Sequence, residues 1–298
     1  MTDMLDYKLI EALAEVVRLG GFEKASRVLN ITQSAISQRV RLLEEMTGQV
    51  LLVRSTPPVA TAAGTRLLRH FLQVRHLEED LLQDMDPESG QRFESVALGV
   101  NADSIATWFL DVVTPFLETE RVTLDVRVED QDQTHSLLRS GHVLGCISSR
   151  ETPVQGCSIA PLGTMVYRMV AKPDFVARWF PSGVTPEAVA NAPLLVFNRK
   201  DLLQHTALEQ IPGVRPENAP THYLPSSEKF VDFIRAGLAY GMLPDLQIRD
   251  LLSRGLLMDL MPDHPVPVRL YWHCWNLKSA FIRRFSDCLV RGARRSLV

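Results

Sequence analysis

Residues 31–45, ITQSAISQRVRLLEE, combine an apolar stripe with side chains that can read hydrogen-bond patterns. On a helix with 100° per residue, Ile36, Val40 and Leu43 share one face. Gln can bond adenine through two atoms, Arg can do so with guanine, and a Ser hydroxyl reaches a base or a phosphate. A face that serves only solubility more often carries Glu and Lys. The stretch therefore predicts contacts with DNA bases from the polar side chains Gln33, Ser34, Ser37, Gln38 and Arg41.

Three further stretches place hydroxyls, an amide and carboxylates where predicted strands end. Backbone N–H groups at a helix start can hold a ligand carboxylate, and paired acids suit an ammonium or guanidinium group. For Ser226 and Ser227 helix capping alone is the simpler explanation, and a solvated strand end explains the acidic pair about as well. The candidate ligand-binding residues are Asn101, Asp103 and Ser104, Glu129 and Asp130, and Ser226, Ser227 and Glu228, with Thr134 and Ser148 lining the same cleft.

Catalytic and metal-binding patterns are not found in the sequence. It contains no HExxH, GxSxG, P-loop or paired CxxC motif. His273 and Cys274 are neighbours on a predicted strand and point to opposite faces, so they cannot easily share a proton. We expect no enzyme activity, no metal and no cofactor, and we expect reduced thiols at Cys146, Cys157, Cys274 and Cys288.

The base-reading stretch needs supporting elements, and the preceding residues supply them. Apolar residues recur at helical spacing over 5–18, ended by Gly20-Gly21, and a short helix follows from Phe22. Thr32 is a predicted N-cap for a third helix that runs to about Thr47. This order predicts a helix-turn-helix, although a three-helix bundle without DNA contact has the same pattern. Residues 50–64, with a Pro-Pro turn, predict a small hairpin wing.

A long helix is predicted from Ala62 to Met85, where 24 residues would span about 36 Å. Apolar residues on alternating spacings of four and three predict a dimerisation seam in which Glu78 occupies one position that should be apolar. These residues are Leu67, Phe71, Val74, Leu81 and Met85. Residues 84–90 are then predicted to form a linker.

Beyond the linker, β-rich runs alternate with helical segments, at 96–100, 122–128, 144–148, 166–171, 193–197 and 268–274. This alternation predicts an α/β domain with a mostly parallel sheet. About 210 residues are generous for one such unit, so we expect two lobes around a ligand-binding cleft.

Charge is distributed unevenly along the 298 residues. The chain has a net charge of −3, whereas the segment from Arg18 to Arg75 holds nine basic against three acidic residues, a net charge of +6. A locally basic region is typical of a DNA-binding module. Arg54, at the predicted wing, would contact phosphate, or else form a salt bridge within the module. Because no signal peptide and no membrane span are predicted, we expect a soluble, cytoplasmic protein.

Residues 22–55 with the following Thr-Ala-Ala-Gly (61–64) resemble the N-terminal signature of LysR-type transcriptional regulators. The effector-domain stretches VNADSIATWFL, RVED, SSEKFV, MLPDLQI and LYWH resemble those of the arginine- and lysine-responsive branch of that family. The resemblance implies a winged helix-turn-helix at 1–61 and a linker and dimerisation helix at 62–86. It also implies a two-lobed effector domain of the periplasmic-binding-protein type (type 2) at 87–298. Lobe I would comprise about 91–164 and 267–298, and lobe II about 165–266.

The resemblance further implies an operator in double-stranded DNA, RNA polymerase as a partner, and a homodimer that pairs into a homotetramer. Its DNA-contacting positions correspond to Gln33, Ser34, Ser37, Gln38, Arg39 and Arg54, so it favours Arg39 where the helical wheel favours Arg41. It also implies control of amino-acid export or metabolism genes by lysine or arginine.

One departure concerns residues 198–200, which read Asn198, Arg199 and Lys200 where that branch carries acids. A basic pair facing the pocket would weaken the binding of a basic ligand.

The alternative to a transcriptional regulator is a DNA-coating or replication-modulating protein without effector control.

Overall fold

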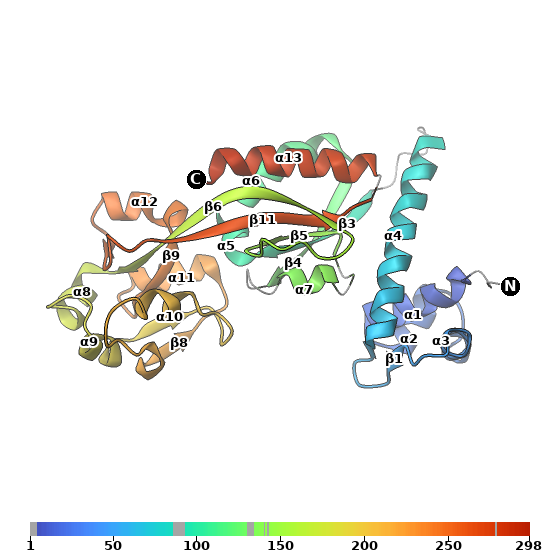
Figure 1. The fold of residues 1–298 in the computed structure, drawn as a ribbon, viewed down its shortest axis with the longest axis horizontal. Coiled ribbons are helices and arrows are strands. Elements are labelled where there is room, and N and C mark those ends of the chain that lie inside the picture. Colours follow the sequence, from blue (N-terminus) through green and yellow to red (C-terminus); the bar gives the residue numbers. More distant parts are fainter. Residues whose placement is uncertain (1–4, 86–92, 130–133, 140, 142, 278) are drawn as a thin grey trace.

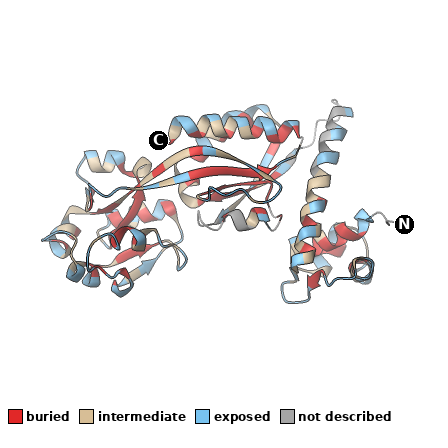
Figure 2. Ribbon diagram, in the orientation of Figure 1, coloured by how far each residue is buried: buried red, intermediate tan, exposed pale blue. Residues whose placement is uncertain are grey.

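The fold is that of a computed structural model, which describes residues 5–85, 93–129, 134–139, 141, 143–277 and 279–298. A small helical head at the N-terminus continues into the long helix α4 (Ala62–Met85), and a larger body built around a sheet lies beside them (Figure 1). We call these parts the head and the effector body. Buried residues form one core in the head and two separate clusters in the effector body, and Figure 2 shows buried segments in red in both parts.

The head is built from α1 (Tyr7–Leu19), α2 (Phe22–Val28) and α3 (Gln33–Thr47). Gly20 and Gly48 end α1 and α3 in left-handed conformation, with φ of 68° and 64°. Thr32 caps α3 by accepting a hydrogen bond from the Ala35 N–H at 3.2 Å. The predicted order of the three helices, the end of the first at Gly20 and the N-cap at Thr32 are therefore confirmed. The apolar stripe of α3 is fully buried against α1 and α2, at Ile36, Val40 and Leu43.

The wing is the antiparallel pair β1 (Leu52–Val53) and β2 (Val59–Ala60). Glu44 of α3 fixes its entry, because its carboxylate accepts hydrogen bonds from the N–H groups of Leu51 and Leu52. Where the wing meets α4, the Thr61 hydroxyl donates to the Val50 carbonyl at 2.7 Å and accepts from the Gly64 N–H at 3.1 Å. A Cβ at Gly64 would lie 2.1 Å from the Leu51 carbonyl oxygen, so only glycine fits this junction.

The helix α4 has the predicted bounds, Ala62–Met85, but its apolar residues divide between two environments. Phe71 is buried in the head core and Leu67 packs against it, so these two predicted seam positions are occupied within their own chain. Leu81 and Met85 are 57% and 73% exposed. The apolar surface that a second copy could cover therefore lies in the C-terminal half of α4.

The effector body contains a seven-stranded mixed sheet of order β10-β6-β11-β5-β3-β4, with β9 also paired to β6. We call the part around β3, β4 and β5 lobe I, and the part around β7, β8 and β9 lobe II. Helices α6 and α13 cover one face of the sheet in lobe I and α7 the other (Figure 1). The strands are β3 (Glu94–Asn101), β4 (Val122–Glu129), β5 (Gly145–Ser148), β6 (Cys157–Ala171), β7 (Leu194–Val196), β8 (Thr221–Tyr223), β9 (Gly241–Pro244), β10 (Met258–Asp259) and β11 (Val266–Trp275).

The helices of this body are mostly short. They are α5 (Ala102–Ser104), a π-helical turn at Ile105–Phe109, α6 (Leu110–Thr119), α7 (Thr134–Arg139), α8 (Pro173–Trp179), α9 (Pro186–Asn191), α10 (Leu203–Leu208), a 3-10 turn at Pro216–Asn218, α11 (Ser227–Arg235), α12 (Asp245–Ser253) and α13 (Ala280–Ser296).

The prediction of a mostly parallel sheet is wrong. Strand β3 pairs in parallel with β4 and β5, and β7 does so with β8. The long strands β6 and β11 are antiparallel to each other, and β11 is antiparallel to β5. The reason is the two-lobed path: β6 carries the chain from lobe I into lobe II and β11 brings it back, so the paired strands run in opposite directions. Residues 86–90 of the predicted linker lie outside the described residues.

Candidate DNA-reading helix and interlobe cleft

The polar face of α3 is open to solvent on the side away from the head core. Gln33, Ser34 and Gln38 are exposed, and Ser37 is half-buried. The Ser34 hydroxyl lies 2.9 Å from that of the capping residue Thr32, so it also supports the start of the helix. The amide groups of Gln33 and Gln38 are thus held on a helix anchored by three buried apolar residues, as a base-reading role requires.

The three arginines of the head have different surroundings. Arg41 is exposed and its Nε donates to the Glu45 carboxylate at 2.9 Å, one helical turn further on. Arg39 is half-buried and makes no ion pair within the described residues. Arg54 is exposed on the wing, and its guanidinium lies 5.7 Å from the centroid of the Phe22 ring. Arg54 was predicted either to contact phosphate or to form a salt bridge inside the head. No such salt bridge is found within the described residues, so the phosphate contact remains a prediction.

A cleft between the lobes gathers polar side chains around Asp103 in α5. The Asp103 carboxylate accepts hydrogen bonds from the Tyr167 hydroxyl at 2.7 Å and from the Ser227 hydroxyl at 2.6 Å. Tyr167 lies on β6 and Ser227 opens α11 of lobe II, so the second bond joins the two lobes. Gln247 of α12 donates to the Ser227 oxygen at 3.2 Å. The predicted site residues Asn101, Asp103 and Ser227 therefore come together around one cavity.

Several buried polar atoms near this cleft have no hydrogen-bond partner within the described residues. They are both amide atoms of Asn101, the Ser104 hydroxyl and the Gln204 Oε1 atom. Such groups are rare inside proteins because each one costs free energy unless water or a ligand satisfies it. A water or a ligand that carries both donors and acceptors would satisfy them.

Asp201 is a second carboxylate on the wall of this cavity and is not one of the ligand-binding residues predicted from the sequence. Its oxygens accept hydrogen bonds from the N–H groups of Phe197 and Leu203, at 3.2 and 2.9 Å. Burial raises the pKa of Asp201, the two backbone donors oppose the rise, and the negative charge of Asp103 adds to it. Its position shortly after the predicted strand at 193–197 was the available signal.

Two acids in one cleft attract a cationic ligand. The cavity they face has a volume of only about 50 Å³, whereas ligand sites usually offer about 300 Å³ or more. An amino acid can therefore enter only if the lobes part or the hydroxyls that now cover Asp103 withdraw.

The basic pair that departs from the expected pattern does not face this cavity. Arg199 and Lys200 are exposed, and the Arg199 guanidinium lies 4.7 Å from the centroid of the Tyr223 ring. The Asn198 side chain turns the chain at this point by accepting hydrogen bonds from the N–H groups of Lys200 and Asp201. The repulsion that an inward-facing basic pair would cause is therefore absent among these residues.

The remaining predicted ligand-binding residues do not line the cavity around Asp103. Thr134 is buried and its hydroxyl donates to the Ile147 carbonyl, while the Ser148 hydroxyl accepts from the Arg150 N–H. Ser226 caps α11 by accepting from the Lys229 N–H, and Glu228 is exposed. The Glu129 side chain and Asp130 lie outside the described residues.

We also searched the described residues for a metal site, a membrane-spanning helix and a reactive thiol. No group of three His, Cys, Asp or Glu among them is placed to hold a metal ion, and none of their helices is long and apolar enough to cross a membrane. Burial raises the pKa of Cys157 to about 11, which keeps this thiol protonated at neutral pH. The buried His273 Nε2 lies 2.8 Å from the Arg150 carbonyl oxygen.

Comparison with family models places this architecture among bacterial regulators. Residues 7–65 match the model of the bacterial regulatory helix-turn-helix protein, lysR family, and residues 89–294 match the LysR substrate binding domain. The chain is 45% identical to the HTH-type transcriptional regulator ArgP of Pseudomonas fluorescens, over 99% of both lengths. It is 42% identical to ArgP of Aeromonas salmonicida, over 98% of both.

Solved structures agree over nearly the whole chain. ArgP from Mycobacterium tuberculosis is 40% identical, with a TM-score of 0.86 and 99% of both chains covered. Full-length LysG from Corynebacterium glutamicum with bound effector Arg is 32% identical, with a TM-score of 0.79, covering 98% of this chain and 99% of that one. These relatives are regulators rather than enzymes, in agreement with the absence of catalytic motifs in the sequence.

Proposed function

The chain belongs to the LysR family of DNA-binding transcriptional regulators, and from that premise we propose that lysine or arginine is its effector, bound in the interlobe cleft. One observation carries the proposal: Asp103 and Asp201 line the same small cavity, so the positive charge of a basic amino acid would be attracted to it. The bound arginine of the related LysG supports this choice. Neighbouring unpartnered groups such as the Asn101 amide suit the polar atoms of an amino acid.

The effector acts by replacing bonds that now join the lobes. The Ser227 hydroxyl of lobe II donates to Asp103 of lobe I, and a ligand ammonium or guanidinium takes over that acceptor. The ligand shifts the lobes because its affinity differs between their two arrangements. This movement reaches the head through the linker helix α4. It changes the spacing on DNA between the α3 helices of two paired copies.

The head reads its operator through α3 in the major groove. Gln33, Ser34, Ser37 and Gln38 contact base edges or nearby phosphates, and Arg54 contacts phosphate from the wing. Arg39 takes the flanking phosphate or base contact, since Arg41 is held by Glu45. The working division of the chain is a head at 1–61, a linker helix at 62–86 and the effector body at 87–298.

Assembly follows from the exposed apolar half of α4. Leu77, Leu81, Leu82 and Met85 are all more than 40% exposed there, and a second copy of α4 would cover them in a homodimer. Two dimers form a tetramer that spans an operator in the cytoplasm, where the protein contacts RNA polymerase and controls genes for amino-acid export or metabolism. The resemblance to regulators of this branch supports these assignments.

The test measures DNA affinity with and without the effector. A duplex selected from a random pool and an unrelated duplex are titrated by fluorescence anisotropy at fixed salt, with lysine, arginine or leucine present. We expect a large preference for the selected duplex and a change in its binding with lysine or arginine only. Equal affinity for both duplexes and no amino-acid response would instead indicate a DNA-coating protein.

The reading role of α3 is tested on the same duplexes. Gln33→Ala should cost about 1 to 3 kcal/mol on the selected duplex and little on the unrelated one, because it removes a base contact. Gln49→Ala, an exposed glutamine beyond the end of α3, is the matched control. An equal loss on both duplexes would contradict base reading by Gln33.

A further inference from the structure

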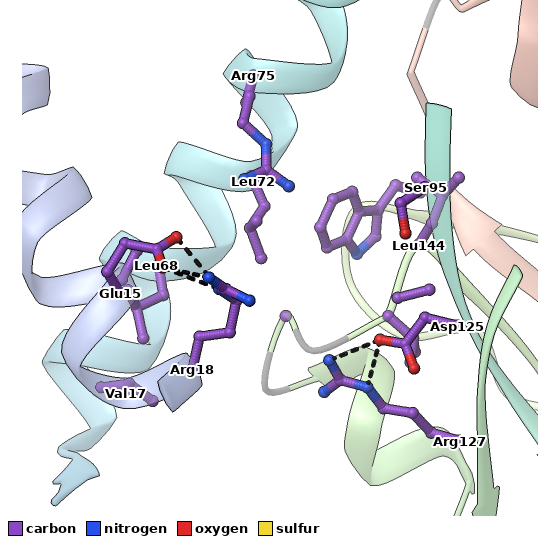
Figure 3. Close-up of a pocket in the computed structure, with 15 residues that line it drawn as sticks. Glu15, Val17, Arg18, Leu68, Leu72, Arg75, Ser95, Asp125, Arg127 and Leu144 are labelled. Atoms are coloured by element: carbon purple, nitrogen blue, oxygen red, sulfur yellow. Dashed lines mark hydrogen bonds and ion pairs between the residues drawn. The ribbon is translucent and has the colours of Figure 1, made fainter. Parts of the chain in front are cut away.

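A second, larger cavity lies between the head and lobe I. Its volume is about 310 Å³, within the usual range for a small-molecule site. Figure 3 shows its two walls: α1 and α4 on one side, and β3, β4 and the Val143–Leu144 segment on the other. Nothing in the regulator mechanism uses this cavity.

Guanidinium groups enter the cavity from opposite walls. Arg18 of α1 binds Glu15 through Nε and Nη2, and Arg127 of β4 binds Asp125 through the same two atoms. A guanidinium has five N–H donors, so three on each arginine remain without a partner within the described residues. Figure 3 shows both groups beside the open space, with Arg75 of α4 above them. Oxygen acceptors placed here would meet donors from both parts of the protein.

The inner part of the cavity is apolar. Leu68 of α4 and the residues Val143, Leu144 and Trp275 of lobe I line it, and all four are at least 94% buried. Trp275 adds an aromatic ring to this lining. An apolar lining with arginine donors beside it suits a ligand that has an apolar body and one anionic end.

We propose that this head–lobe cavity is a second ligand site, which binds a small organic carboxylate with a flat apolar body. The carboxylate accepts hydrogen bonds from Arg18 and Arg127, and the body packs on Trp275 and Leu68. The site is distinct from the interlobe cleft because the two cavities share no lining residue.

A ligand here would join the two parts that must move relative to each other. The parts already touch: Leu72 of α4 packs against both hydrophobic cores, and a Cβ at Gly141 of lobe I would lie 3.1 Å from the Arg69 Cα. A ligand bonded to Arg18 of the head and to Arg127 of lobe I strengthens this contact. Its occupancy would therefore favour one orientation of the reading helix.

The test uses three probes with the same ring and different ends: phenylacetate, 2-phenylethanol and phenethylamine. Isothermal titration of the full chain should give saturable binding of phenylacetate, and at least about tenfold weaker binding of the alcohol and the amine. Arg18→Gln and Arg127→Gln should each weaken phenylacetate binding at least about tenfold. Arg254→Gln, an exposed arginine paired with Asp250 in lobe II, should leave it unchanged.

Two measurements keep the result interpretable. Thermal melts of the ligand-free variants show whether each one is folded. Arg18 belongs to the head and Arg127 to lobe I, so if one variant fails to fold, the other still tests the proposal. Asp103→Asn, in the interlobe cleft, should retain phenylacetate binding. The proposal is overturned by equal affinity for the three probes, by no phenylacetate binding, by indifference to both arginine substitutions, or by a loss in Asp103→Asn.

Discussion

Replacement of Asp201 by Asn removes one of the two negative charges in the interlobe cleft while keeping the side-chain shape. Asn Oδ1 can still accept from the Phe197 or Leu203 N–H, so the loop loses at most one of two hydrogen bonds. That loss costs about 1 kcal/mol of folding stability, and removal of a carboxylate whose pKa burial has raised offsets part of it. We therefore expect a folded variant whose defect lies in ligand binding.

The magnitude follows from the bond that the ligand loses. A hydrogen bond between a cation and a carboxylate contributes about 1.5 to 3 kcal/mol, so the Kd for arginine should rise about 10- to 150-fold in Asp201→Asn. Citrulline has nearly the shape of arginine and no side-chain charge. The wild-type protein should prefer arginine over citrulline, and the variant should lose most of that preference if Asp201 contacts the guanidinium.

The assay is isothermal titration of both proteins with both ligands. Asp232→Asn is the matched control, because Asp232 is an exposed acid on α11 that pairs with Lys229 and does not line the cleft. If Asp201→Asn discriminates arginine from citrulline as the wild type does, and binds arginine equally well, the assignment of Asp201 to the effector site is refuted.

Four further predictions follow from the described contacts. Gly64→Ala should lower the head's unfolding free energy by about 1 to 3 kcal/mol, measured by denaturant melts, because its Cβ would overlap a carbonyl oxygen. Arginine affinity should fall on acidification through the raised pKa of Asp201, because the protonated acid carries no charge, and this pH dependence should flatten in Asp201→Asn. Arg39→Gln should weaken operator binding and reduce its salt dependence more than Arg41→Gln, whose arginine already pairs with Glu45; the reverse order would support the helical wheel. Leu81→Glu should shift the assembly toward monomers in analytical ultracentrifugation, whereas an unchanged mass would exclude this part of α4 from the interface.

Local sequence signals were sufficient for the head. Thr32, Gly20 and Gly48 mark helix ends through their own backbone and hydroxyl chemistry, and the spacing of Ile36, Val40 and Leu43 determines which face of α3 is buried. The linker helix was also predicted with its observed bounds, because the 24 residues contain no proline and their single glycine, Gly64, lies in the first turn. Such features depend on residues within one or two helical turns of each other.

The pairing of strands that lie far apart in the sequence could not be predicted from such local signals. Strand β6 and strand β11 are separated by some ninety residues, and neither sequence indicates whether its partner runs parallel or antiparallel. The prediction of a mostly parallel sheet failed because strands pair in parallel within each lobe, whereas the long strands that cross between the lobes pair antiparallel. The predicted dimerisation seam on α4 includes a position that is wrong for a related reason. Phe71 has the spacing of an interface residue, yet it is buried in the head core of its own chain.

Local motifs at strand and helix ends were enough to predict the family, a candidate DNA-reading helix and the positions of Asn101, Asp103 and Ser227. Which of the ten candidate ligand residues share a cavity, that Asp201 joins them, and that Arg199 and Lys200 face away became visible only in the folded chain. It alone brought Arg18 of the head opposite Arg127 of lobe I. The physical reason is that a binding site requires side chains from distant segments to converge, and convergence is set by packing of the whole chain rather than by any segment's own pattern.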